Sequence, residues 1–155
     1  MYETNLMTLL AFKIKAFKEI STQELYEVLR LRSEVFVVEQ NCVYQDIDSK
    51  DQEAIHVLGY YNGELAAYCR LFDAGNYFDN ASIGRVIVAQ KFRGKKWGNN
   101  LIVEAITVIK QYFGKREITI SAQLYLQKFY ESHGFAKTSE MYLEDDIPHI
   151  EMKKH

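Results

Sequence analysis

The fold is decided by the stretch from Ile83 to Leu101, which reads IGRVIVAQKFRGKKWGNNL. It begins as an apolar strand, continues as a basic loop with two glycines and ends in the start of a helix. This order brings backbone N–H groups and the positive end of a helix to one place, and such places hold phosphate in proteins. The stretch therefore indicates a cofactor site at the end of a strand, and the spacing of the loop indicates which cofactor.

The spacing excludes two common phosphate-binding loops. A P-loop has four residues between its glycines and then Lys-Ser/Thr, whereas three residues separate Gly94 from Gly98 and Asn99 follows. The dinucleotide pattern G-x-G-x-x-G is absent as well. The loop instead resembles the Arg/Gln-x-x-Gly-x-Gly/Ala loop of the GNAT superfamily of acyl-CoA-dependent N-acetyltransferases. Arg93 matches the first position of that loop and Gly98 the last, while Lys96 stands where the middle glycine usually is.

Composition and length narrow the class of protein. A chain of 155 residues is one domain's worth, so we expect a single domain over residues 1–155. The formal net charge of -2 disfavours bulk nucleic-acid binding. Residues 1–10 lack the pattern of a secretion signal and no apolar run is long enough to span a membrane, so we expect a cytoplasmic protein with free thiols at Cys42 and Cys69.

Local patterns predict the helices. Ser21 to Glu24 reads as a capping box that opens a helix running to about Val37, and the polar stretch 45–53 reads as a loop. A second helix follows the basic loop and ends at Gly114. A short third helix ends at Gly134. The apolar stripe of the second helix consists of Leu101, Ala105, Val108, Ile109 and Tyr112.

The remaining apolar runs predict strands. Asn62-Gly63 and Asp145-Asp146 are the turn signals between neighbouring runs. The economical fold is a mixed α/β (α+β) arrangement with a central mixed sheet and helices on both faces. The predicted strands are 11–17, 55–61, 64–72, 82–89, 117–122, 135–143 and 147–153.

A second segment strengthens the resemblance. The run from Ala122 to Phe135, AQLYLQKFYESHGF, is similar to the GNAT segment that ends in Tyr-x-x-x-Gly-Phe. Together with the segments 31–48, 83–88 and 144–150, it closely resembles the ElaA-like subfamily of GNAT acetyltransferases. That subfamily shares Lys at the Lys96 position. The resemblance implies the GNAT acyl-CoA N-acyltransferase fold, but it does not supply the acceptor.

The resemblance also implies a site for acetyl-CoA, the expected co-substrate. The pyrophosphate is expected on the amides of the basic loop and the helix start, and the pantetheine arm is expected to pair with the strand before it. Tyr130 stands at the family's position for protonating the leaving thiolate, and a phenol is protonated at neutral pH. The cofactor-binding residues implied are Val86, Ile87, Val88, Arg93, Gly94, Lys95, Lys96, Trp97, Gly98, Asn99, Gln123, Phe129 and Tyr130.

The general base is less well defined by the sequence. His149 is attractive because an imidazole titrates near neutrality, and it is our catalytic candidate beside Tyr130. His56, Glu39 and Glu140 compete with it, as does a chain of water molecules.

Two charged groups of residues need a separate explanation. Arg70 and Arg85 lie in apolar strands and require partners such as Glu39 or Asp48, or an acidic acceptor; we favour structural pairing. The aspartates of the 45–53 loop superficially resemble a calcium site. They lack the glycine and closing glutamate of an EF-hand, so no metal is expected.

The resemblance implies an N-acetyltransferase that moves an acetyl group directly from the thioester to a primary amine. The acceptor is either a small amine in an enclosed, acid-lined pocket or a peptide amine in an open groove near the last two strands. The alternative is a non-catalytic acyl-CoA-binding sensor or interaction module on the same fold, favoured by Lys96 and the undefined base. Exposed aromatic residues would support a homodimer.

Overall fold

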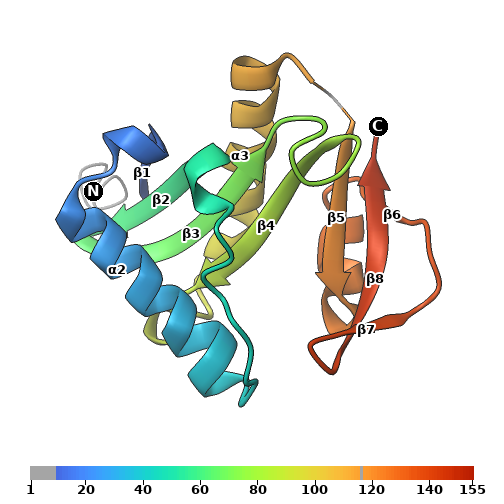
Figure 1. Ribbon diagram of the computed structural model, residues 1–155, viewed down its shortest axis with the longest axis horizontal. Helices are drawn as coiled ribbons and strands as arrows, with labels where there is room; N and C mark the ends of the chain where they lie inside the picture. Colours follow the sequence, from blue (N-terminus) through green and yellow to red (C-terminus); the bar gives the residue numbers. More distant parts are fainter. Residues whose placement is uncertain (1–9, 116) are drawn as a thin grey trace, which may run out of the picture.

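The computed structural model describes residues 10–115 and 117–155 and shows one mixed sheet with helices on both faces (Figure 1). The strands run in the order β1-β2-β3-β4-β5-β8-β6, and β7 pairs with β8 at the end of the sheet. This is the predicted mixed α/β architecture. The sequence analysis expected no secretion signal in residues 1–10. Residues 1–9 of this segment lie outside the described part of the chain.

Most predicted strands form within a residue or two of the predicted bounds. Asn62 and Gly63 both have positive φ, 50° and 77°, as a two-residue hairpin turn requires. Asp145 and Asp146 do the same between the last two strands, with φ of 50° and 63°. The strands are β1 (Ala11–Ala16), β2 (Ile55–Tyr61), β3 (Glu64–Phe72), β4 (Ala81–Val88), β5 (Ile118–Gln123), β6 (Ala136–Lys137), β7 (Tyr142–Glu144) and β8 (Ile147–Lys154).

One predicted strand is wrong in its extent. The run 135–143 was expected to be continuous, but only β6 and β7 form within it. Between them, Thr138 donates its N–H to the carbonyl of Glu151, and the N–H of Glu151 donates to the side chain of Ser139. Because a side chain replaces a backbone partner here, the ladder is interrupted where the sequence pattern shows no break.

The first helix, α2 (Thr22–Arg32), starts at the predicted capping box. Ser21 accepts from the Glu24 N–H, and the Glu24 carboxylate accepts from the Ser21 N–H. Helical structure continues as the π-helix η2 (Ser33–Glu39), two residues beyond the predicted end. α2 covers one face of the sheet, where Val28 and Leu31 pack in a core cluster with Tyr68. The wider turn of η2 ends at the mouth of the cavity described below.

The second helix, α3 (Trp97–Phe113), covers the opposite face. Leu101, Ala105, Val108 and Ile109 are buried against the main core cluster, as the stripe predicts. Tyr112 was expected in this stripe, but its side chain is 53% exposed. The neighbouring Phe113 packs against the core instead. Gly114 ends the helix in the left-handed conformation and donates its N–H to the carbonyl of Lys110. The predicted third helix, α4 (Gln127–Glu131), is short, and a 3₁₀ turn, η5 (Leu124–Leu126), precedes it.

Two neighbouring strands diverge in the middle of the sheet. β4 and β5 are parallel and pair only at Ala81–Ile118 and Ser82–Thr119, after which they separate (Figure 1). On its other edge β4 stays paired with β3, but its register shifts between Gly84 and Ile87. Arg85, within this shift, has a φ of +51°. Such a bulge bends a strand, and here it accompanies the opening between β4 and β5.

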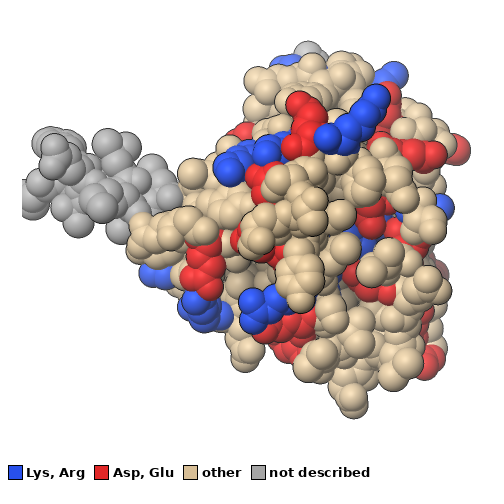
Figure 2. Space-filling model, turned by 60° about the vertical axis from the view of Figure 1, so that its left-hand side comes forward, with Lys and Arg blue, Asp and Glu red and all other residues tan. Residues whose placement is uncertain are grey.

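The surface carries no dominant charge of either sign on the face shown in Figure 2, where acidic and basic side chains are interspersed. This agrees with the small formal net charge of -2. In residues 10–115 and 117–155, no helix combines the length and the apolar character needed to cross a membrane.

Candidate functional site

A cavity of about 490 Å³ occupies the gap between β4 and β5. One wall is the part of β4 from Ile83 to Val88, and the facing wall is formed by β5 and the segment that leads into α4. The η2 helix and the β7–β8 turn contribute the remaining sides. Of the predicted site residues, the structure brings the following to this cavity: Val86, Ile87, Val88, Arg93, Gly98, Gln123, Phe129, Tyr130 and His149.

The loop after β4 meets the cavity at Arg93 and Gly98, whereas the other predicted loop residues, Gly94, Lys95, Lys96, Trp97 and Asn99, do not line it. The N–H of Arg93 donates to Gln90 and that of Asn99 to Lys96, so these two are occupied. Among the described residues, residues 94–98 donate no backbone hydrogen bond, and α3 begins without a side-chain cap. Of the amides in the predicted anion site, those of residues 94–98 are therefore the ones left free to donate, and they lie at a helix N-terminus.

The conformation of the loop accounts for Lys96. This residue has φ 61° and ψ 25°, the left-handed conformation that glycine adopts most readily. The lysine thus reproduces the backbone that a glycine would give, at a cost in strain. Trp97 serves packing, because its indole is 6% exposed and lies against the rings of Tyr61 and Phe92.

The exposed edge of β4 offers further backbone groups. The N–H of Ala89 donates to Ala66, and hydrogen-bonding direction alternates along a strand, so the N–H and C=O of Val88 point toward the cavity. Arg93 confirms this direction, because its Nε donates to the Val88 carbonyl at 3.0 Å. The same alternation pairs the backbone of Ile87 with β3, so Ile87 cannot offer its amide as the sequence analysis assumed.

Tyr130 lies in the wall of this cavity. The residue is 5% exposed, and its hydroxyl has no hydrogen-bond partner among the described residues. Burial raises the pKa of the phenol, with smaller contributions from Cys69 and Tyr125. The proton therefore stays on the oxygen until a strongly basic atom enters the cavity.

Comparison with known proteins gives the same picture. Residues 15–155 match the family model described as the acetyltransferase (GNAT) domain. This chain belongs to the GNAT acetyltransferase family. It is 43% identical over 138 residues to Protein ElaA of Escherichia coli, covering 88% of this chain and 90% of that one.

Two crystal structures show the same fold. An acyl-CoA N-acyltransferase from Pseudomonas aeruginosa superposes with a TM-score of 0.89 at 38% identity, covering 94% of this chain and 99% of that one. Escherichia coli ElaA superposes with a TM-score of 0.88 at 39% identity, covering 95% and 100%. The GNAT fold and an acyltransferase activity therefore follow for this chain, and the ElaA-like resemblance is confirmed.

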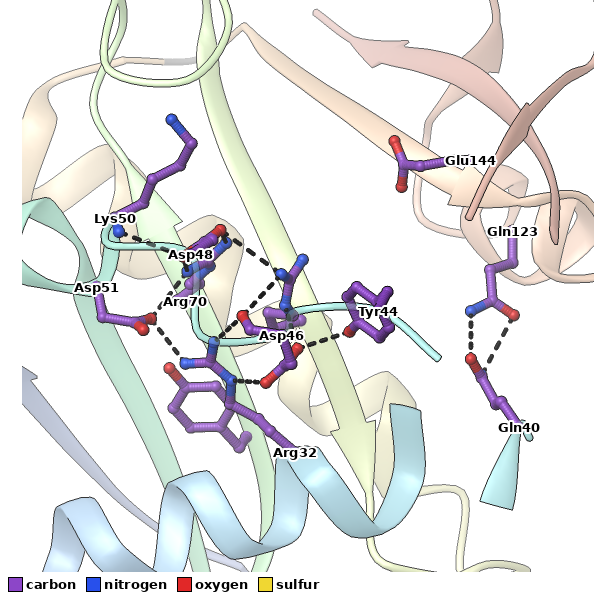
Figure 3. A network of polar contacts seen from close by, with 12 residues as sticks. Arg32, Gln40, Tyr44, Asp46, Asp48, Lys50, Asp51, Arg70, Gln123 and Glu144 are labelled. Carbon is purple, nitrogen blue, oxygen red and sulfur yellow. Dashed lines mark hydrogen bonds and ion pairs between the residues drawn. The ribbon is translucent and has the colours of Figure 1, made fainter. Parts of the chain in front are cut away.

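Beside the cavity of this GNAT chain lies a buried network of three arginines and three aspartates (Figure 3). Asp46 accepts from Arg32 Nε at 2.8 Å and from Arg85 Nε at 2.7 Å. Asp51 bridges Arg32 and Arg70, at 2.7 and 2.8 Å. Arg70 also binds Asp48, as the sequence analysis favoured. Structural pairing thus accounts for these charges.

The network holds the 45–53 loop against β3 and β4. Burial raises the pKa of the Asp51 carboxyl, but hydrogen bonds and charge from Arg32 and Arg70 outweigh it and hold that pKa below its usual value. Burial likewise raises the pKa of the Asp48 carboxyl, but the hydrogen bond and the charge of Arg70 outweigh it and hold that pKa below its usual value. Because Arg85 is the bulged residue of β4, its bond to Asp46 also fixes the bend beside the cavity.

The structure shows where each of the competing candidate bases lies relative to the cavity. His56 is 1% exposed and binds Tyr68 and the carbonyl of Asp51, outside the cavity. Glu39 lines the cavity but is paired with Arg93 at 2.6 Å, rather than with Arg70 or Arg85. Glu140 does not line it. Within the described ranges, no group of three His, Cys, Asp or Glu is arranged to hold a metal ion.

The sequence analysis did not reveal the contacts that several cavity residues make with one another. Gln40 and Gln123 exchange amide contacts of 3.3 and 3.5 Å across the opening (Figure 3). Cys42 lies in the wall and donates to the carbonyl of Asp145 at 3.3 Å. Glu144 lies beside His149. These contacts join segments up to 103 residues apart, so local periodicity does not reveal them.

Proposed function

We propose that this chain transfers an acetyl group from acetyl-CoA directly to a primary amine. The observation that carries the proposal is that unpaired backbone donors occur at two places, at Val88 on the open edge of β4 and at the amides of residues 94–98, with the paired amides of Ala89, Phe92 and Arg93 between them. Val88 lines the same cavity as Tyr130, a residue that is 5% exposed and whose hydroxyl has no hydrogen-bond partner among the described residues. A long ligand with a pyrophosphate at one end and amide groups in its arm matches that order.

The donor is held at two places. The pyrophosphate accepts from the amides of residues 94–98 and lies at the positive end of the α3 dipole. The pantetheine amides run along β4 and pair at Val88, beside Val86. For the Val88 carbonyl to pair, the Arg93 side chain gives up its 3.0 Å contact with it. Gln123 and Phe129, on the facing wall, contact the arm from the other side.

Within the cavity, the amine attacks the thioester carbonyl carbon, and the C–S bond then breaks. A free N–H of β4 stabilises the oxyanion, and Tyr130 donates its proton to the departing thiolate. His149 accepts a proton from the incoming ammonium. An ammonium and a thioester give an amide, a thiol and one proton released to solvent, so atoms and charge balance.

The non-catalytic alternative loses one of its two supports. Lys96 favoured a binding-only protein because it replaces a glycine, but its backbone has the left-handed conformation that a glycine would adopt. Tyr130 favours catalysis, because it lines the cavity with a hydroxyl that has no partner among the described residues, and binding alone does not need an acid there. The thiols of Cys42 and Cys69 suit the reducing cytoplasm in which we propose that the enzyme works.

The test is an assay of thiol release with acetyl-CoA and a panel of amines. Tyr130→Phe is expected to lower kcat by about 10²-fold or more, as loss of a general acid does, while acetyl-CoA affinity measured by calorimetry stays the same. Tyr112→Phe, on the exposed surface of α3, is the matched control and is expected to leave kcat unchanged. An unchanged kcat in Tyr130→Phe removes that residue from its role. Absence of binding heat with acetyl-CoA refutes the function.

A further inference from the structure

The β7–β8 hairpin brings a second group of polar residues to the cavity. Tyr142 and His149 are cross-strand partners, and their rings stack at 6.1 Å with an interplanar angle of 21°. Glu144 follows at the end of β7, and its carboxylate Oε2 lies 3.4 Å from Nε2 of His149. Both Glu144 and His149 line the same cavity as Tyr130.

The hydrogen bonding of His149 shows which of its two ring nitrogens must carry a hydrogen. The other nitrogen, Nε2, faces Glu144. Nδ1 lies 2.7 Å from the carbonyl oxygen of Ile147, and a carbonyl can only accept, so Nδ1 carries the hydrogen. In the neutral ring, Nε2 therefore presents a lone pair. The side chain is 8% exposed, and among the described residues no donor reaches Nε2. When the ring is neutral, Nε2 and the carboxylate oxygen are two acceptors that lie 3.4 Å apart.

A relay of hydroxyl groups orients the carboxylate. Ser121 donates to Oε1 of Glu144 at 3.2 Å. Because a serine hydroxyl has a single hydrogen, Tyr142 must be the donor in its 2.5 Å contact with Ser121. Burial, the largest cause, raises the pKa of the Tyr142 phenol, which keeps it a donor. Oε2 is left free to face the cavity beside Nε2.

The charges around this pair determine which ligand it suits. The other charged groups in the cavity wall include Glu39 and Arg93, which pair with each other, and Arg85, which is taken by Asp46. Asp145, in the adjoining turn, adds a second carboxylate to this side. The surplus charge at the hairpin is therefore negative, which attracts a cation and repels an anion close to the amine.

We infer that Glu144 and His149 form the acceptor site, and that it takes an alkylammonium cation with no carboxylate next to its amine. The inference rests on the proposed function and names its acceptor class. The ammonium donates one N–H to Oε2 of Glu144 and another to Nε2 of His149. The second N–H bond then breaks as the Nε2–H bond forms, which leaves a neutral amine and an imidazolium beside the Glu144 carboxylate.

Matched pairs of acceptors test this directly. Tyramine and tyrosine present the same phenolic body without and with a carboxylate next to the amine, and phenylethylamine and phenylalanine do the same for an unsubstituted ring. With acetyl-CoA in excess, we expect kcat/KM to be at least about tenfold higher for the cation of each pair. Glu144→Gln is expected to raise KM for the cations about tenfold, with a smaller effect on kcat, and to abolish the difference within each pair.

Glu140→Gln is the matched control, because Glu140 is exposed and lies outside the cavity wall. A direct binding measurement separates this inference from the proposed function. Titration of 1,5-diaminopentane, followed by NMR of the histidine imidazoles, is expected to shift the His149 resonances in the wild type and in Glu140→Gln, but not in Glu144→Gln. Equal kcat/KM within the pairs, or no His149 shift in the wild type, overturns the acceptor site. Loss of acetyl-CoA binding heat is instead a failure of the proposed function.

Discussion

Replacing Asp46 by Asn tests whether the buried network supports the β4 bend. The wild-type network contains three arginines and three aspartates and is electrically balanced (Figure 3). Asp46 is central to it, because its carboxylate accepts from Arg32, Arg85 and the hydroxyl of Tyr44. Asn keeps the shape of Asp46 but removes its charge, which leaves one positive charge in excess among buried groups.

The expected loss of stability depends on the ion pairs that Arg32 and Arg85 retain in Asp46→Asn. Arg32, 1% exposed at its side chain, retains its 2.7 Å bond to Asp51, and Arg85, 18% exposed, retains Asp48 at 3.5 Å. Breaking a buried ion pair by removing one partner costs about 3–5 kcal/mol. Since both arginines keep a second carboxylate, we expect the lower end, a loss of about 3 kcal/mol in the free energy of unfolding.

Urea unfolding of Asp46→Asn, Arg85→Gln and the double variant provides the measurement. The double variant restores charge balance, so it is expected to be more stable than the sum of the single changes by about 1–2 kcal/mol. Asp79→Asn, an exposed aspartate in the β3–β4 connection, is the control and should stay within about 0.5 kcal/mol of the wild type. A loss below about 1 kcal/mol for Asp46→Asn, or strict additivity in the double variant, contradicts the reasoning.

Two further changes test other parts of the fold. Burial raises the pKa of Glu24, but Lys15 and Ser21 outweigh it and lower that pKa to about 2. The stability it contributes, about 1–3 kcal/mol, is present above the unfolded pKa near 4.5 and lost as the pH falls toward 2. Thermal melts between pH 6 and 2 should show a smaller acid loss in Glu24→Gln, and an equal loss refutes this assignment. Lys96→Gly is expected to raise stability by up to about 1 kcal/mol by relieving the left-handed strain, whereas Lys95→Gly gives no gain; urea midpoints decide, and equal effects contradict the explanation.

Local chemistry made much of the fold predictable. Turn residues such as Asn62-Gly63 act within two or three positions, and the capping box at Ser21 closes within its own first turn. The sequence missed the break between β6 and β7, because the interruption depends on Ser139 bonding to the backbone of Glu151. It also misplaced Tyr112, whose spacing matches the buried stripe although its side chain is 53% exposed.

The residues of the candidate site were likewise predictable only in part. The basic loop and the Tyr-x-x-x-Gly-Phe segment were visible because each is a contiguous motif in the sequence. The alternation that directs Val88 but not Ile87 to the cavity was not visible, because it depends on the register with β3. Neither were the partners of Asp46, 14 and 39 residues away in Arg32 and Arg85.

The sequence by itself determined the family, the order of strands and helices along the chain and the position of the basic loop before α3, because these depend on short-range spacing and turn chemistry. Tertiary structure alone decided where β4 and β5 part, how three arginines and three aspartates neutralise one another, and which carboxylate meets Nε2 of His149. The physical reason is that charge pairing and cavity shape depend on distances across the folded molecule, and residues far apart in the chain set those distances.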